Sequence, residues 1–293
     1  MAATSAKATP GGDWWKKGPS LMDISIRGHR CTFDRVGSGP DLTLLHSVGL
    51  STREGWRAQI PLLAQHFTVL SYDFRGLGQS ERGSEPLGVD TFVRDLEELL
   101  RQLGVARTAL MGVSLGGFVA QEFTIRNPDP VSSLVLVSTT SRIYEGHAAR
   151  RAARNEAIRK AGMAAAANHQ LDSHFPDDFA NANLGVIDWY RAHYLANDPA
   201  NYIEIMDDLG RFDSSERLSR IGCPTLIAAG GDDASSVAGR APLDSARTLN
   251  RLIAGSELAV VAGAFHYPQI DHAPAFNDTV LDFLMRTARA PAR

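Results

Sequence analysis

The pentapeptide at residues 112–116 most constrains the fold of this chain, because it matches the pattern G-x-S-x-G with Ser114 at its centre. It follows a short apolar run at 108–111, typical of a buried strand, and precedes a helix-forming stretch that begins at 117. A serine on a tight strand-to-helix turn projects its hydroxyl above the sheet, close to the N–H groups that open the helix. The flanking glycines suit such a turn because larger side chains would not fit beside the serine. We therefore interpret Ser114 as a nucleophile; the alternative is an ordinary glycine-rich turn.

Strand-like and helix-like patterns alternate on both sides of this motif. The predicted strands are 23–28, 30–36, 41–46, 67–73, 108–111, 133–137, 224–229 and 258–261. The predicted helices are 55–65, 89–103, 117–126, 242–252 and 274–288. Continuous apolar strands separated by helices indicate a mainly parallel sheet that is covered on both faces. The sequence therefore predicts an α/β fold.

A long helical insertion interrupts this alternation. Residues 141–219 contain no convincing strand and have the character of several helices, including the alanine-rich stretch 161–167 and the stretch 186–195. We expect this insertion to form a helical cap on a core that consists of residues 21–140 and 220–293.

Composition excludes several classes of protein. The net charge of −3 gives no reason to expect nucleic acid or an anionic membrane as a partner. No stretch approaches the ~20 apolar residues of a membrane span. Residues 1–20 lack the apolar core of a signal peptide, so we expect a flexible leader, which Trp14 and Trp15 could attach to the body or to a neighbouring subunit of a homo-oligomer. Cys31 and Cys223 form no C-x-x-C motif and are expected to be reduced, which suits a cytoplasmic protein.

A serine nucleophile needs a histidine base that is oriented by a carboxylate, and in this kind of fold the chain order is serine, acid, histidine. His266 follows the strand 258–261, so it is expected at the same sheet edge as Ser114, and we prefer it to His272 as the base. After the strand 224–229, the sequence Gly230-Gly231-Asp232-Asp233 offers two adjacent carboxylates. We choose Asp233 as the acid, because the glycine pair can make the turn and Asp232 can belong to that turn or cap it.

The oxyanion formed by such a reaction needs N–H donors that are already in place. The first candidate is the backbone N–H of Leu115, directly after the nucleophile, and the second is the backbone N–H of Val48 in the loop 46–49. The alternative for this loop is a plain strand-to-helix connection. The glycine-rich and charged segment 73–80 is assigned a structural role, in shaping the loop on the oxyanion side.

The sequence gives no sign of a metal or a cofactor. It contains no H-x-x-H, H-E-x-x-H or cysteine cluster, and no G-x-G-x-x-G follows the first strand. The chemistry is therefore predicted to be free of metal and of cofactor.

Six motifs in this order resemble the α/β-hydrolase superfamily over residues 22–286: H-S-V-G (46–49), D-F-R-G-L-G-Q-S (73–80), G-V-S-L-G-G (112–117), S-T-T-S-R (138–142), G-G-D-D (230–233) and A-F-H-Y-P-Q-I-D (264–271). Within it, W-R-A-Q-I-P (56–61) and the segments 75–80, 112–121 and 134–142 are most similar to the 3-oxoadipate enol-lactonase-like group. The resemblance implies the α/β-hydrolase fold with a cap, the triad Ser114, Asp233 and His266, and the oxyanion donors Val48 and Leu115.

The chain also departs from that group. His46-Ser47 replaces the usual residues of the oxyanion loop, His174 stands in the cap where a tryptophan is common, and Asp271 replaces a glutamate. We consider His46, Arg142 and His174 as substrate-binding candidates, and Arg142 or His174 could meet a substrate carboxylate.

These residues predict a cofactor-free serine hydrolase that cleaves a small ester or lactone through an acyl-enzyme, with 3-oxoadipate enol-lactone as one candidate. One alternative is a C–C bond hydrolase of ring-cleavage (meta-cleavage) products, whose oxyanion loop is longer and richer in glycine than residues 46–49. Another is a non-catalytic receptor that uses the same fold to hold a small molecule. The fold alone does not distinguish these functions.

Overall fold

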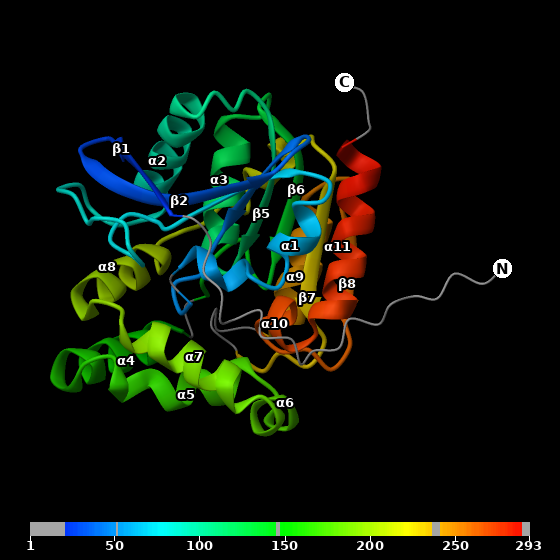
Figure 1. Ribbon diagram of the computed structural model, residues 1–293. Coiled ribbons are helices and arrows are strands. Elements are labelled where there is room, and N and C mark those ends of the chain that lie inside the picture. Colours follow the sequence, from blue (N-terminus) through cyan, green and yellow to red (C-terminus); the bar gives the residue numbers. More distant parts are fainter. Residues whose placement is uncertain (1–20, 51, 145–146, 236–240, 289–293) are drawn as a thin grey trace.

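An eight-stranded sheet forms the centre of the protein, in the order β1-β2-β4-β3-β5-β6-β7-β8 (Figure 1). The computed structural model describes residues 21–50, 52–144, 147–235 and 241–288. The strands are β1 (Met22–Ile26), β2 (His29–Gly37), β3 (Asp41–Leu45), β4 (Thr68–Tyr72), β5 (Thr108–Val113), β6 (Val131–Val137), β7 (Thr225–Gly230) and β8 (Glu257–Val261). β2 runs antiparallel to β1 and β4, and all other neighbouring strands are parallel. The predicted α/β fold is confirmed.

Helices cover both faces of the sheet, which explains why the inner strands read as continuous apolar runs. Every residue of β5 and β7 is buried, whereas the edge strand β8 is largely exposed. The helices of the core are α1 (Ile60–Leu63), α2 (Val89–Gln102), α3 (Leu115–Arg126), α9 (Pro242–Leu252), α10 (Pro268–Asp271) and α11 (Ala273–Ala288). In the described part of the chain, no helix is both long and apolar enough to cross a membrane.

The predicted helix 55–65 is wrong in extent. The chain forms a short 3₁₀ helix, η2 (Arg53–Trp56), and then the single-turn helix α1. Pro61 lies in the first turn of α1, where its missing N–H does no harm, but it could not lie inside a continuous helix. The backbone of Arg53 is also tied to Asp73, which fixes the start of η2 independently of α1.

The insertion forms five α-helices that lie together at the carboxyl ends of the parallel strands (Figure 1). They are α4 (Ala148–Ala161), α5 (Ala164–His174), α6 (Asp177–Ala182), α7 (Leu184–Leu195) and α8 (Pro199–Leu209). The alanine-rich stretch 161–167 is not one helix, because Gly162 has a φ of +70° at the end of α4 and breaks it. The boundaries of core and cap stay a prediction, and the expected leader 1–20 lies outside the described residues.

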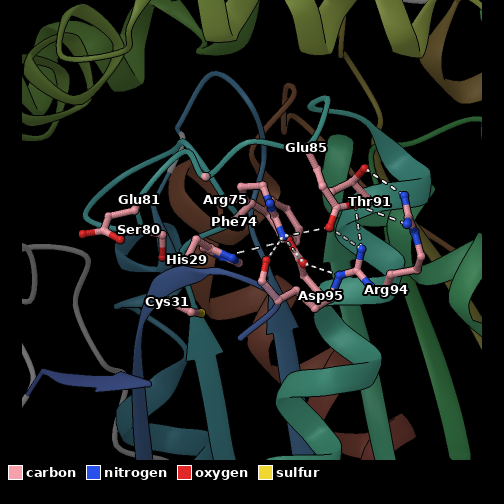
Figure 2. A network of polar contacts seen from close by, with 12 residues as sticks. His29, Cys31, Phe74, Arg75, Ser80, Glu81, Glu85, Thr91, Arg94 and Asp95 are labelled. Carbon is pink, nitrogen blue, oxygen red and sulfur yellow. Dashed lines mark hydrogen bonds and ion pairs between the residues drawn. The ribbon is translucent and has the colours of Figure 1, made fainter. Parts of the chain in front are cut away.

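A network of buried charges joins the segment after β4 to α2 (Figure 2). The Arg75 guanidinium donates two hydrogen bonds to Asp95, of 2.7 and 2.8 Å, and both side chains are almost fully buried. Arg27 also donates to Asp95 and reaches Glu85, which pairs in turn with Arg94. Bidentate geometry makes the Arg75–Asp95 pair strong, and its burial makes either charge costly without the other.

Replacing Asp95 with asparagine should therefore destabilise the protein. Asp95→Asn leaves the buried Arg75 charge with only its longer ion pair to Glu85, at 3.8 Å, and we expect the free energy of unfolding to fall by about 3 kcal/mol. The control is Asp90→Asn on the same helix: the Asp90 side chain is 60% exposed and its ion pairs are at the surface. That control should cost less than about 1 kcal/mol. Urea denaturation of both variants measures the difference, and equal losses would contradict the structural role of the network.

Candidate active site

Ser114 occupies a strained turn between β5 and α3. Its φ of +52° and ψ of −112° lie in a region that residues other than glycine rarely adopt. The two flanking glycines make this turn possible: a Cβ at Gly112 would overlap the carbonyl oxygen of Gly116, and one at Gly116 would overlap that of Leu45. The Ser114 N–H donates to the Val137 carbonyl at 2.9 Å, which holds the turn against the neighbouring strand.

Asp233 and His266 form a buried pair after β7 and β8. The His266 Nδ1 lies 3.1 Å from the Asp233 Oδ2, and the Ser235 hydroxyl lies 3.2 Å from the same nitrogen. The Ser235 N–H donates to the other Asp233 oxygen at 2.9 Å and so orients the carboxylate. Because Nδ1 is held by the carboxylate, Nε2 is the ring nitrogen left to exchange a proton.

The adjacent candidates lie in different surroundings. Asp232 is exposed, and its N–H donates to the Ala264 carbonyl, as a turn residue would. His272 pairs with Asp271 at 3.1 Å, and its side chain is 34% exposed. His266 lines a cavity together with Ser114, and His272 is not in the described lining of that cavity.

Two small cavities adjoin Ser114 and His266. One, of about 40 Å³, has an apolar side made by Phe118, Ile143 and Pro242. The other, of about 20 Å³, lies beneath the insertion and is lined by Val48 and by residues of α4, α5 and α8. Each has room for only a few waters, so we expect side chains or the insertion to move when a substrate binds at Ser114.

The loop after β3 places Val48 beside Ser114. The Ser47 hydroxyl hydrogen-bonds to the Tyr267 hydroxyl at 2.8 Å, which ties this loop to the residue that follows His266. Glycine at position 49 keeps this region uncrowded, because a Cβ there would lie 3.0 Å from the Tyr267 hydroxyl and 3.1 Å from that of Tyr190. Among the described residues, no acceptor occupies the N–H of Val48 or of Leu115, so both are free to donate to a ligand.

Asp73 fixes the segment that follows this loop. Its carboxylate accepts hydrogen bonds from the Arg53 N–H at 2.7 Å, from the Arg53 Nη1 at 2.6 Å and from the Gln79 N–H at 2.8 Å. Arg53 Nε also donates to Asp34 at 2.6 Å, and burial raises the pKa of Asp34. These contacts are internal to the fold and agree with a structural role for residues 73–80.

His46 has no nitrogen left for a substrate, contrary to our expectation. The Phe74 N–H donates to its Nε2 at 2.9 Å, and its Nδ1 lies 2.8 Å from the Ser47 carbonyl, to which it donates. Burial lowers the pKa of His46 to about 4, so the ring is neutral at pH 7. Its observed role is to join the loop 46–49 to the segment after β4.

Arg142 also lies apart from the site. Its half-exposed side chain pairs with Asp213 at 3.6 Å and lies over the Tyr144 ring. A β-bridge links the same two residues, 142 and 213, so Arg142 helps to close the two ends of the insertion. It is not in the described lining of either cavity at Ser114.

His174 is the one substrate-binding candidate that the structure brings to Ser114. Its ring stacks on that of His266, with centroids 4.5 Å apart and an interplanar angle of 23°. Nδ1 hydrogen-bonds to the Tyr190 hydroxyl at 2.9 Å, and the buried Nε2 has no hydrogen-bond partner. Burial, and then the nearby His266, hold the pKa of His174 well below its usual value, so the ring stays neutral.

Sequence reasoning missed Arg154, Gln170 and Tyr202, which line the 20 Å³ cavity from the insertion. Nothing in the sequence distinguishes Arg154 from its neighbours Arg150 and Arg151 on a helix rich in arginine and alanine. In the described residues, no cluster of three or more His, Cys, Asp or Glu side chains could hold a metal ion.

Comparison with known proteins identifies the family. Residues 42–273 match the model of the alpha/beta hydrolase fold family, which is well over half of the chain. The chain belongs to this family. The predicted superfamily is thus confirmed.

Relatives of several kinds share this fold. The putative carbamate hydrolase RutD of Stutzerimonas stutzeri is 30% identical over 247 residues, covering 83% of this chain and 91% of RutD. An uncharacterized protein of Mycobacterium tuberculosis is 36% identical over 120 residues, 41% of this chain and only 35% of that protein, about a third of its length. The crystal structure of the enol-lactonase from Burkholderia xenovorans LB400 is 26% identical, with a TM-score of 0.83 over 90% of this chain and 100% of that chain.

The close approach of the turn to β3 can be tested directly. Gly116→Ala places a methyl group against the Leu45 carbonyl, and we expect it to lower the free energy of unfolding by about 3 kcal/mol. Gly222→Ala is the control, because a Cβ there has no atom within 4 Å. The control should change stability by less than about 0.5 kcal/mol. If both variants unfold at the same urea concentration as the wild type, the turn is not packed as described.

Proposed function

We propose that this protein is a serine hydrolase that cleaves small esters or lactones through an acyl-enzyme. The observation that carries the proposal is that Ser114 and His266 line the same cavities. Asp233 contacts the His266 ring at Nδ1, 3.1 Å away, and so leaves Nε2 available. A strained serine between a strand and a helix, next to a histidine with a buried carboxylate partner, is the arrangement that activates a hydroxyl for attack on a carbonyl.

In the first step, the His266 Nε2 takes the Ser114 hydroxyl proton as Oγ attacks the substrate carbonyl. The negative charge that develops on the carbonyl oxygen is met by the N–H groups of Val48 and Leu115. Asp233 keeps the His266 ring in the required tautomer and stabilises it while it carries the proton. The leaving oxygen then receives that proton, and the acyl group stays on Ser114.

In the second step, His266 removes a proton from water as the water attacks the acyl-enzyme; the bond from the acyl carbon to the Ser114 Oγ then breaks, His266 returns the proton to Oγ, and the acid leaves. For a lactone, the alcohol stays tethered to the acyl group, so the product is a single ring-opened hydroxy acid or its keto form. His174, which belongs to the insertion, helps to hold the His266 ring in position, because its neutral ring stacks on that of His266.

Two relatives support cleavage of a small acyl compound. One is named an enol-lactonase and the other a putative carbamate hydrolase. 3-Oxoadipate enol-lactone is therefore the first lactone to test, with loss of its ultraviolet absorbance as the signal. A p-nitrophenyl ester tests the general hydrolase activity without assuming the natural substrate.

Ser114→Ala should abolish the activity. We expect kcat for p-nitrophenyl butyrate to fall at least ~10³-fold, because the proposed acyl-enzyme forms on the Ser114 hydroxyl. The matched control is Ser71→Ala on β4, whose hydroxyl is buried without a hydrogen-bond partner, and it should keep activity within about threefold.

Retained activity in Ser114→Ala would overturn the mechanism. A wild-type protein that binds small acyl compounds without turning them over would instead support the receptor function. Ring-cleavage products hydrolysed faster than any ester or lactone would support the C–C bond hydrolase.

A further inference from the structure

An arginine with no ion pair to a described residue lines the cavity beside the nucleophile. Arg154, on α4, shares the 20 Å³ cavity with Ser114, His266 and His174. The described lining of this cavity contains no carboxylate. The two histidines that line it, His174 and His266, are both buried. Arg154 is therefore the one fixed charge among the described residues that line this cavity.

Arg154 also lacks an acidic partner elsewhere. No Asp or Glu of the described chain lies within ion-pair distance of it. Its polar contact is a long hydrogen bond of 3.5 Å to Asn155, its guanidinium lies 5.6 Å from the centre of the Tyr202 ring, and its Nε is buried without a hydrogen-bond partner. By contrast, Arg151 and Arg159 on the same helix pair with Asp207 and Glu156.

A larger basic cavity continues from Arg154. Its volume is about 320 Å³, and its lining includes Arg154, Arg150, His147 and His169, with no carboxylate among the described lining residues. Burial is the main cause that lowers the pKa of His147 to about 4, and Arg154 and Arg150 lower it further, so His147 is neutral at pH 7 and the arginines supply the positive charge. The cavity also shares Ser235 with the 40 Å³ cavity and Gln170 with the 20 Å³ cavity, so it adjoins the site from both sides.

We propose that Arg154 binds a carboxylate of the substrate, so that the preferred substrates are anionic esters or lactones, such as half-esters of dicarboxylic acids. The inference rests on the proposed function, because it places the carboxylate relative to a carbonyl at Ser114. A guanidinium with free donors matches a carboxylate in charge and shape. Among the described residues that line the 20 Å³ cavity, Arg154 is the one fixed cation, which suits a substrate with a single negative charge.

Two matched pairs of esters test this proposal. Monomethyl glutarate and methyl valerate differ by a carboxylate on the acyl half, and 4-acetoxybenzoate and phenyl acetate differ by one on the alcohol half. We expect Arg154→Gln to lower kcat/KM for the carboxylated member of at least one pair by about 10- to 100-fold. The neutral member of that pair should change by less than about threefold.

The controls separate charge recognition from folding. Arg154→Lys keeps the charge and should recover part of the lost kcat/KM, with most of the remaining deficit in KM. Arg159→Gln removes an exposed, ion-paired arginine from the same helix and should change neither ester pair. Turnover of the neutral esters by Arg154→Gln shows that this variant is folded.

Each outcome decides a different claim. If Ser114-dependent turnover is present but Arg154→Gln affects both members of each pair equally, the anion site is wrong and the hydrolase stands. If Arg154→Gln loses all activity, Arg154→Lys decides: selective recovery of the carboxylated esters supports the site, and equal recovery of both members overturns it. If the wild type shows no Ser114-dependent turnover of any ester or lactone, the proposed function itself fails.

Discussion

The contact between the serine turn and the end of β3 is the constraint on which the site depends. Gly116 lies so close to the Leu45 carbonyl that only a glycine fits, and this closeness brings the start of α3 against the loop after β3. Val48 and Ser114 therefore come from segments far apart in the chain but line one cavity at the sheet edge. The strain of the φ at Ser114 is tolerated because β6 and the turn itself hold the backbone in place.

The remaining parts of the site are attached to this point by buried polar contacts. Tyr267 couples the β3 loop to the loop that carries His266, while Asp73 and Arg53 fix the chain behind it. The insertion takes part as well, since His174 stacks on His266 and Arg154 reaches the same cavity. In the proposed function, residues from the core supply the chemistry, and Arg154 from the insertion selects the charge of the substrate.

The sequence was sufficient where structure is set locally. Continuous apolar runs placed the strands, helix 242–252 was predicted with the bounds it has, and the G-x-S-x-G turn lies where the motif put it. Prediction from the sequence failed where tertiary contacts determine the length of a helix or the direction of a side chain. Pro61 and the ties on Arg53 shorten the helix expected at 55–65, and the inward direction of His46 follows from a backbone N–H 28 residues away. Arg154 was missed and Arg142 chosen, because only the packing of α4 against α8 tells which arginine faces the cavity.

The most direct test of the account is covalent labelling with a fluorophosphonate, read by mass spectrometry of the intact protein and of its peptides. We predict a single adduct on the peptide that contains Ser114, formed much more slowly in His266→Ala and absent from Ser114→Ala. Such a result would show that the turn, the histidine and the oxyanion donors together make one activated serine. An unlabelled wild-type protein, or an adduct on a different residue, would contradict the claim that this geometry activates Ser114.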